Sequence, residues 1–181
     1  MGALLGLSRI IDRINTAIGK AAGWLILVAV LISAGNAVVR KAFDVSSNGW
    51  LELQWYLFGA VFMLCAAYTL LQNEHVRIDI VISRFSRRTR NIVEILGHVF
   101  FLMPFALLML YLSVPFFLRS FAIGEHTSDA GGLILWPAKI LLPIGFALLV
   151  LQGISELIKR GAILGGVLPD DAAPDEQLGP H

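Results

Sequence analysis

The stretch AAGWLILVAVLISAGNAVV, residues 21–39, decides the fold class, because it contains no charged residue and is bracketed by Lys20 and Arg40. The hydrocarbon core of a bilayer is about 30 Å thick, and an α-helix crosses it in roughly 20 residues. A cleaved signal peptide has a shorter apolar segment, of about 7–15 residues, followed by small residues. This stretch instead ends in Val38 and Val39. We therefore predict a retained transmembrane helix.

The composition of the whole chain agrees with a membrane protein. Of its 181 residues, 57% are hydrophobic and 15% are charged, whereas soluble domains have about 45–50% apolar and about 25% charged residues. The formal net charge of +1 provides no basic excess for a polyanion, so we do not expect nucleic acid as a partner. The single cysteine, Cys65, lies in an apolar run and is expected to be a packing residue.

Three further apolar stretches are long enough to span a bilayer. The second stretch carries Glu52 near its start and the third carries Glu94. We start the fourth at Pro137, since proline is tolerated at the first position of a helix, and leave open whether Gly131–Leu135 lies in the membrane. The predicted fold is an all-α membrane protein with four transmembrane helices, at about residues 21–39, 49–73, 92–117 and 137–158.

The distribution of lysine and arginine predicts the orientation of these spans, because positive residues are retained on the cytoplasmic side. Ten basic residues lie in the N-terminal segment, the second connection and the C-terminal segment: Arg9, Arg13, Lys20, Arg77, Arg84, Arg87, Arg88, Arg90, Lys159 and Arg160. Three lie on the opposite side: Arg40, Lys41 and Arg119. We therefore predict that both termini are cytoplasmic.

Two segments have the periodicity of amphipathic helices. In residues 1–20 an apolar face lies opposite a polar face, Arg9, Asp12, Arg13 and Asn15; the apolar residues are Leu4, Leu7, Ile11, Ile14 and Ile18. The second connection has an apolar stripe (Ile78, Val81, Ile82 and Phe85) beside arginines. We predict interfacial helices at the N-terminus and between the second and third spans, with a solvated basic loop as the alternative for the connection. The acidic, proline-containing segment 161–181 is expected to be a disordered tail.

Charged residues inside a span are costly, so each needs a partner or a route to the interface. Glu52 and Lys139 lie near the outer ends of the second and fourth spans, at similar depth. We predict an ion pair between them. The alternatives are that each side chain extends separately to the headgroups, or that each pairs with a charge on another subunit.

The histidines do not form a convincing ligand set. His98 and His75 lie on the cytoplasmic half but differ in depth, which argues against a shared haem, and His126 has no neighbours with the spacing of a metal site. No phosphate-binding loop or activated nucleophile is present, and the spans lack the polar midplane groups of a substrate site. We expect no catalytic, cofactor-binding or metal-binding residue, and so an accessory or scaffold subunit and not an enzyme.

Three motifs add a resemblance to a known family. They are WLELQWYLFG at residues 50–59, AAYTL at 66–70 and EHVRID at 74–79. Together they resemble the small membrane subunit (DctQ type) of tripartite ATP-independent periplasmic (TRAP) transporters. In that family a tryptophan and a glutamate open the second helix and an HVRVD-like sequence ends it.

The resemblance implies a sodium-coupled secondary transporter of the bacterial inner membrane that imports small organic solutes, carboxylates among them. Its partners would be a large permease subunit, which holds the substrate and sodium sites, and a periplasmic solute-binding protein. This chain would hold no cofactor and would brace the large subunit. The residues expected at the outer edge or partner interface are Trp50, Glu52, Trp55, Trp136 and Lys139; those expected to fix the inner turn are His75, Arg77 and Asp79.

Two other functional classes remain open at this point. A haem- or quinone-linked membrane anchor of a redox enzyme also has few spans and scattered histidines. A small transporter or channel that works without partners is the other alternative.

Overall fold

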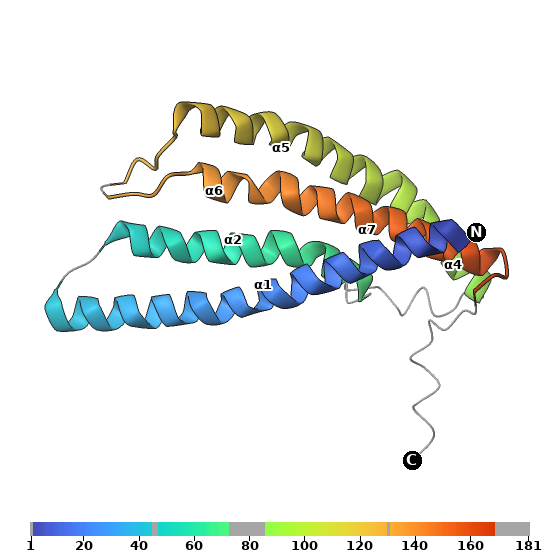
Figure 1. Cartoon of the computed structure of the whole chain (residues 1–181), viewed down its shortest axis with the longest axis horizontal. Helices are drawn as coiled ribbons and strands as arrows, with labels where there is room; N and C mark the ends of the chain where they lie inside the picture. Colours follow the sequence, from blue (N-terminus) through green and yellow to red (C-terminus); the bar gives the residue numbers. More distant parts are fainter. Residues whose placement is uncertain (1, 45–46, 73–85, 130, 169–181) are drawn as a thin grey trace, which may run out of the picture.

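The computed structural model describes residues 2–44, 47–72, 86–129 and 131–168, which form a bundle of long antiparallel helices (Figure 1). Four helical segments are long and apolar enough to cross a membrane, which confirms the four predicted spans. The described elements are α1 (Gly2–Phe43), α2 (Asn48–Leu71), α4 (Arg87–Gly97), the π-helical turn η1 (His98–Leu102), α5 (Met103–Ile123), α6 (Trp136–Lys139) and α7 (Leu141–Leu164).

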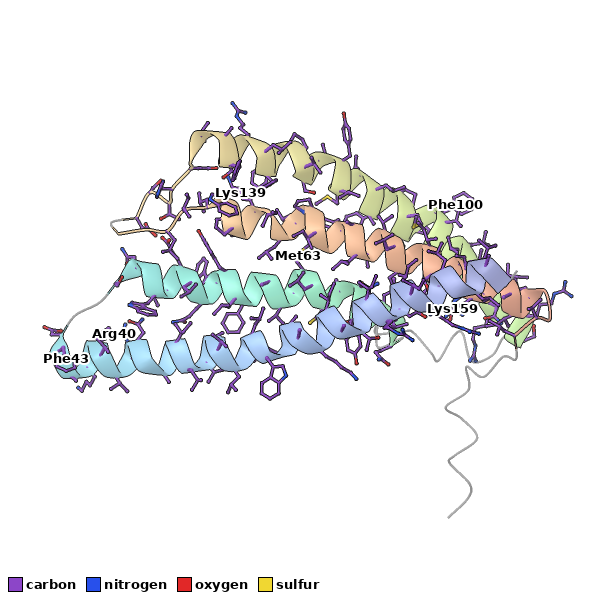
Figure 2. All side chains as sticks on the ribbon, in the orientation of Figure 1. Arg40, Phe43, Met63, Phe100, Lys139 and Lys159 are labelled. Carbon is purple, nitrogen blue, oxygen red and sulfur yellow. The ribbon has the colours of Figure 1, made fainter. Side chains whose placement is uncertain are left out.

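Helix α7 is the central element of the bundle. In its most apolar window 50% of the residues are buried inside the molecule, against 11%, 17% and 6% for the spans of α1, α2 and α4–α5. The core lies where α7 meets α2 and α5, around Leu70, Ala106, Phe146 and Leu149. Large apolar side chains cover the outer surfaces of the other spans, as expected for helices that meet lipid (Figure 2). Cys65 is half-buried, with its thiol donating to the carbonyl of Gly19 on α1 at 3.7 Å, in keeping with a packing residue.

Helix α1 differs from the prediction, because one continuous helix of 42 residues replaces an interfacial helix followed by a separate span. At 1.5 Å per residue its length is about 63 Å, twice the thickness of the hydrocarbon core. The N-terminal half turns its polar side inward: Ser8 and Asn15 are buried, whereas Leu7 and Ile10 are exposed. Asp12 and Asn15, which we expected to meet solvent, therefore pack against α7, whereas Arg9 and Arg13 of the same polar face are exposed.

The third span is longer than predicted at both ends, running from Arg87 to Ile123 without a break in the helical chain. Its π-turn, in which the amide of Met103 donates to the carbonyl of His98, directly precedes Pro104. Proline has no amide hydrogen and its ring clashes with the carbonyl four residues back, so a wider turn at this point accommodates it.

The fourth span begins at Trp136, as the tryptophan–proline pair predicted, and ends at Leu164, beyond the predicted residue 158. The helix is interrupted at Ile140, because Pro143 cannot donate to the carbonyl of Lys139. Residues 131–135 precede this helix and fold back on the outer loop: the Thr127 amide donates to the Leu133 carbonyl at 3.1 Å, and the Leu135 amide donates to the Glu125 carbonyl at 2.8 Å.

The start of α1 and the end of α7 lie at the same end of the bundle, opposite the loop that joins α5 to α6 (Figure 1). We call the end with the start of α1 and the end of α7 the inner end, and the end with the α5–α6 loop the outer end. Of the segment 161–181 that was predicted to be a disordered tail, residues 161–164 instead belong to α7, and residues 169–181 lie outside the described residues. The predicted helix around residues 78–85 also lies outside them, as do His75, Arg77 and Asp79.

Candidate functional site

A buried polar network joins α1 to α7 near the inner end. Gln152 is fully buried at its centre, and its carbonyl oxygen accepts from the Asn15 amide at 2.7 Å. The Gln152 amide donates to Asp12 Oδ1 at 2.9 Å and to Glu156 Oε1 at 3.1 Å. One glutamine side chain therefore links three polar side chains from two helices.

Serines and a lysine complete this network. Ser155 Oγ donates to Asp12 Oδ1 at 2.7 Å and lies 2.7 Å from Ser8 Oγ. Lys159 Nζ lies 3.2 Å from Asp12 Oδ2 and 2.5 Å from Glu156 Oε1, so one ammonium group bridges both carboxylates. Such pairing removes most of the cost of placing these charges between helices.

A second polar contact holds α7 to α4 on the other side. Arg160 is 6% exposed and forms an ion pair with Glu94, while its guanidinium donates to the side-chain oxygen of Asn91 at 3.1 Å. The inner half of α7 is therefore fixed to α1 through one set of polar groups and to α4 through another. Two of the ten basic residues that indicated the orientation, Lys159 and Arg160, are thus paired with acids within the protein.

At the outer end, Glu52 holds the loop that precedes α6. Its Oε2 accepts from the backbone amide of Leu133 at 2.7 Å, and one turn further along α2 the Tyr56 hydroxyl donates to the Ile134 carbonyl at 3.3 Å. The predicted Glu52–Lys139 ion pair is therefore wrong: Lys139 pairs instead with Glu125. The folded loop brings a backbone amide to Glu52 and a carboxylate to Lys139, and the sequence pattern gave no indication of either contact.

Glu125 and Lys139 form the outer counterpart of the inner ion pairs, and Figure 2 shows Lys139 and Lys159 at opposite ends of the bundle. The hydrogen bond from the Lys139 ammonium lowers the pKa of the Glu125 carboxyl below its usual value. Lys139 also lies 4.3 Å from the ring centroid of Phe116, a cation–π contact with α5. Trp136 packs edge-on against Phe121 with centroids 5.4 Å apart, so it joins α6 to α5.

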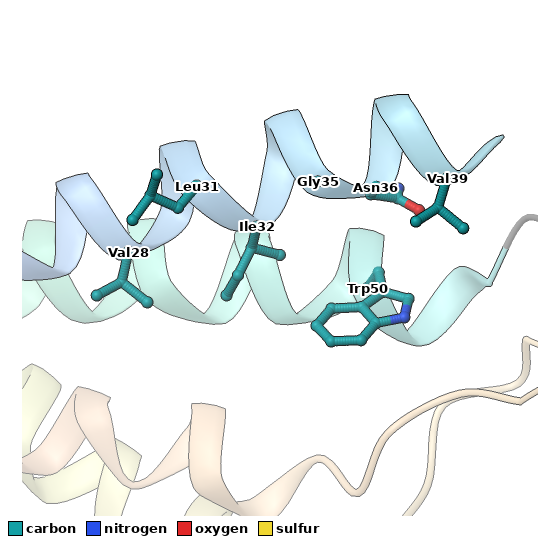
Figure 3. Close-up of a pocket in the computed structure, with 7 residues that line it drawn as sticks. All are labelled: Val28, Leu31, Ile32, Gly35, Asn36, Val39 and Trp50. Carbon is teal, nitrogen blue, oxygen red and sulfur yellow. The ribbon is translucent and has the colours of Figure 1, made fainter. Parts of the chain in front are cut away.

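The other two tryptophans that were predicted at the outer edge or partner interface, Trp50 and Trp55, face outward. Trp55 is 78% exposed, and Trp50 forms one wall of an apolar groove beside α1 (Figure 3). This groove has a volume of about 600 Å³. The α1 residues that line it are Val28, Leu31, Ile32, Gly35, Asn36 and Val39. We call this surface the α1 groove.

The described histidines are engaged with the backbone. His98 Nδ1 lies 2.7 Å from the Glu94 carbonyl and His126 Nδ1 lies 2.7 Å from the Gly124 carbonyl. They lie near opposite ends of the third span, so these two cannot share a haem. Within the described ranges no group of three or more metal-ligating side chains comes together.

The inner network was missed because its residues were interpreted singly. Gln152, Ser155, Glu156 and Lys159 recur at steps of three, one and three, which places them on one face of α7. Ser8, Asp12 and Asn15 form a matching face of α1. Two polar faces of this kind, each next to an apolar run, are the signal that could have predicted the contact.

Comparison with known proteins assigns the family. The family model for the DctQ component of tripartite ATP-independent periplasmic transporters matches residues 20–161, which is most of the chain. A comparison with curated proteins finds no match. The matched region contains all of α2, α4, η1, α5 and α6 and most of α7, and it begins within α1. The chain therefore belongs to the DctQ family, the small inner-membrane component of TRAP transporters, as the motifs of the second span predicted.

Proposed function

We propose that this chain is the static scaffold of a sodium-coupled, binding-protein-dependent TRAP transporter that imports small organic, carboxylate-bearing solutes. It holds the large permease subunit in place, and that subunit carries the substrate and sodium sites. The family supplies the transporter context and the expected partners: a large permease subunit and a periplasmic binding protein.

The observation that carries the bracing role is the fixation of the fourth span, α6 and α7, at both of its ends. At the inner end Lys159 pairs with Asp12 of α1, and Arg160 pairs with Glu94 of α4. At the outer end the Lys139–Glu125 pair holds the start of the fourth span to the end of the third. A moving subunit needs a partner whose helices keep their positions, and multiple ion pairs between helices supply that rigidity.

The distribution of charge along the spans supports placing the transport sites in the partner. In the described part of the chain, the charged side chains with the polar contacts described above lie towards the ends of the bundle: Glu52, Glu125 and Lys139 at the outer end, and Asp12, Glu94, Glu156, Lys159 and Arg160 towards the inner end. A transporter that binds its own substrate near the midplane needs polar or charged groups there. A scaffold subunit does not need polar or charged groups at the midplane.

The remaining parts of the proposal follow from the sequence. The inner end faces the cytoplasm, so that both termini are cytoplasmic, because the excess of lysine and arginine lies on that side. The exposed apolar face of residues 4–14 meets the inner leaflet, with Arg9 and Arg13 near the headgroups. His75, Arg77 and Asp79 fix the inner turn, and Trp50 and Trp55 serve the outer edge or the partner interface.

Reconstitution tests this function. Proteoliposomes are prepared with the large subunit alone, this chain alone, or both, and uptake of labelled organic acids is measured with binding protein outside and an inward sodium gradient. Uptake is expected with both subunits and sodium, and in neither single-subunit preparation. Uptake by this chain alone would contradict the scaffold role, as would full uptake by the large subunit alone.

A further inference from the structure

The outer half of α1 has an open side. In its inner half α1 contacts both α2 and α7, but towards the outer end it diverges from α7 and runs beside α2 (Figure 1). The α1 groove lies on this outer half, between α1 and Trp50 of α2 (Figure 3). The groove therefore opens on a surface that this chain does not itself cover.

Lipid tails would satisfy the apolar lining of the groove, so hydrophobicity alone does not identify its occupant. Asn36 indicates a protein occupant, because its side-chain amide lies in the groove and has no hydrogen-bonding partner among the described residues. It is four residues before Arg40, which places it about 6 Å inside the charged end of the span. An acyl chain cannot donate to or accept from this amide, whereas a polar side chain or carbonyl of a neighbouring helix can.

The shape of the groove also suits a helix. Gly35 lies beside Asn36, and a side chain added there would meet no atom within 4 Å. A glycine on an open helix face lets a second helix approach closely. The outer surface of α5 differs, since Phe101, Phe105 and Tyr111 project from it and are 77%, 55% and 75% exposed. Such a surface of large side chains is typical of a lipid-facing helix.

We propose that the α1 groove receives a transmembrane helix of the large permease subunit, with a polar group of that helix bonded to the Asn36 amide. This inference rests on the proposed function, in which the chain acts as a scaffold for that subunit. It places the subunit contact on the outer half of α1 and Trp50, and leaves α5 to the lipid. Glycine at position 35 is required for the approach of the partner helix, not for the fold of this chain.

Photo-cross-linking in the assembled complex tests the placement. A photoreactive phenylalanine analogue replaces Ile32 or Val39 in the groove, or Tyr111 on α5 as the control, and the complex is irradiated in native membranes. Adducts with the large subunit are expected from positions 32 and 39 and not from position 111. Adducts from position 111 alone, adducts between two copies of this chain, or no protein adduct from the groove while the complex is intact would each overturn the proposal.

A matched pair of substitutions tests the energetics. Gly35→Leu fills the groove, whereas Gly23→Leu adds the same side chain to the opposite face of α1, where there is also open space. We expect Gly35→Leu and Asn36→Leu to reduce recovery of the large subunit on tagged small subunit by about three- to thirtyfold, and Gly23→Leu to leave it unchanged. Equal recovery with all three variants would refute the groove contact.

These results separate the inference from the function on which it rests. If the wild-type chain recovers the large subunit and the groove variants do so equally well, the subunits associate through another surface. If the wild-type chain recovers none, the scaffold function itself fails. Size-exclusion profiles of each variant alone, expected to match the wild type, establish that the chain still folds.

Discussion

Gln152 provides the most direct test of the inner network, because a single side chain there bonds Asn15, Asp12 and Glu156. Leucine has a similar volume and cannot form hydrogen bonds, so Gln152→Leu removes the bonds without leaving a large cavity. Asp12 keeps its bonds to Ser155 and Lys159 in this variant. Asn15 loses its bond to Gln152 and stays buried.

The expected loss of stability follows from the Asn15 side-chain amide, which is left without a hydrogen-bonding partner. Asn15 is 2% exposed, and its side-chain oxygen already has no partner, so the substitution leaves the whole amide unsatisfied. A buried polar group without a partner costs about 1–3 kcal/mol. Individual hydrogen bonds between membrane helices average about 0.6 kcal/mol, and the largest reach about 1.7 kcal/mol. We expect Gln152→Leu to destabilise the chain by about 2 kcal/mol.

A double-mutant cycle measures the contact itself. The free energy of unfolding in mixed micelles is compared for the wild type, Gln152→Leu, Asn15→Leu and the double variant. Each single variant leaves the side-chain amide of the other residue without its partner, whereas the double variant removes both amides. We therefore expect the double variant to be about 1 kcal/mol more stable than the sum of the single effects predicts. The same change at the exposed Gln72 should alter stability by less than about 0.5 kcal/mol. Additive single effects would refute a direct Asn15–Gln152 bond.

Three further predictions concern single contacts. Arg160→Met removes the ion pair with the Glu94 carboxylate, which is 11% exposed, and should destabilise the chain by up to about 3–5 kcal/mol; Arg160→Met combined with Glu94→Met should restore part of this loss, and no recovery would count against the pair. Because its lysine partner lowers the pKa of Glu125, this carboxylate stabilises the folded state above its unfolded-state pKa, and the stabilisation is lost as pH falls through the lower folded-state pKa. Glu125→Gln should therefore reduce the acid sensitivity of unfolding, and an unchanged pH profile would contradict the pairing. Gly145→Ala places a methyl group 2.8 Å from a backbone carbonyl of α2 and should cost about 1–3 kcal/mol, whereas Gly161→Ala, in open space, should cost nothing; equal thermal stability of the two variants would disprove this packing.

Much of the fold could be predicted from the sequence because apolar length and charge determine which segments cross a bilayer. The uncharged run before Arg40 and the Trp136–Pro137 pair marked the end of one span and the start of another within a few residues. The helix boundary at Lys20 was wrong because a charge marks the edge of the hydrocarbon core, not the end of hydrogen bonding along the backbone. No proline interrupts the segment 2–43, so the helix continues through the boundary.

The contacts were less predictable than the helices. Depth along the helix correctly placed Glu52 and Lys139 near the outer end, but depth gives no information on how the intervening loop folds. That loop brought Glu125 to Lys139 and the Leu133 amide to Glu52. The polar face of residues 8–15 was assigned to solvent because amphipathicity shows that a helix has two faces and not which face is covered.

The rigidity of this chain during transport is the property that most directly tests the scaffold role. Spin labels at Val38→Cys on α1 and Ile123→Cys on α5, both highly exposed positions near the outer end, are introduced in a Cys65→Ala background. Their separation is measured by pulsed electron paramagnetic resonance in the complete transporter, with and without sodium, substrate and binding protein. If the chain acts as a rigid scaffold, the distance distribution between the two labels is expected to be the same in every state. A shift of about 5 Å or more on loading, the size of a one-turn helix displacement, would show that this chain moves with the transport cycle and would contradict the scaffold role.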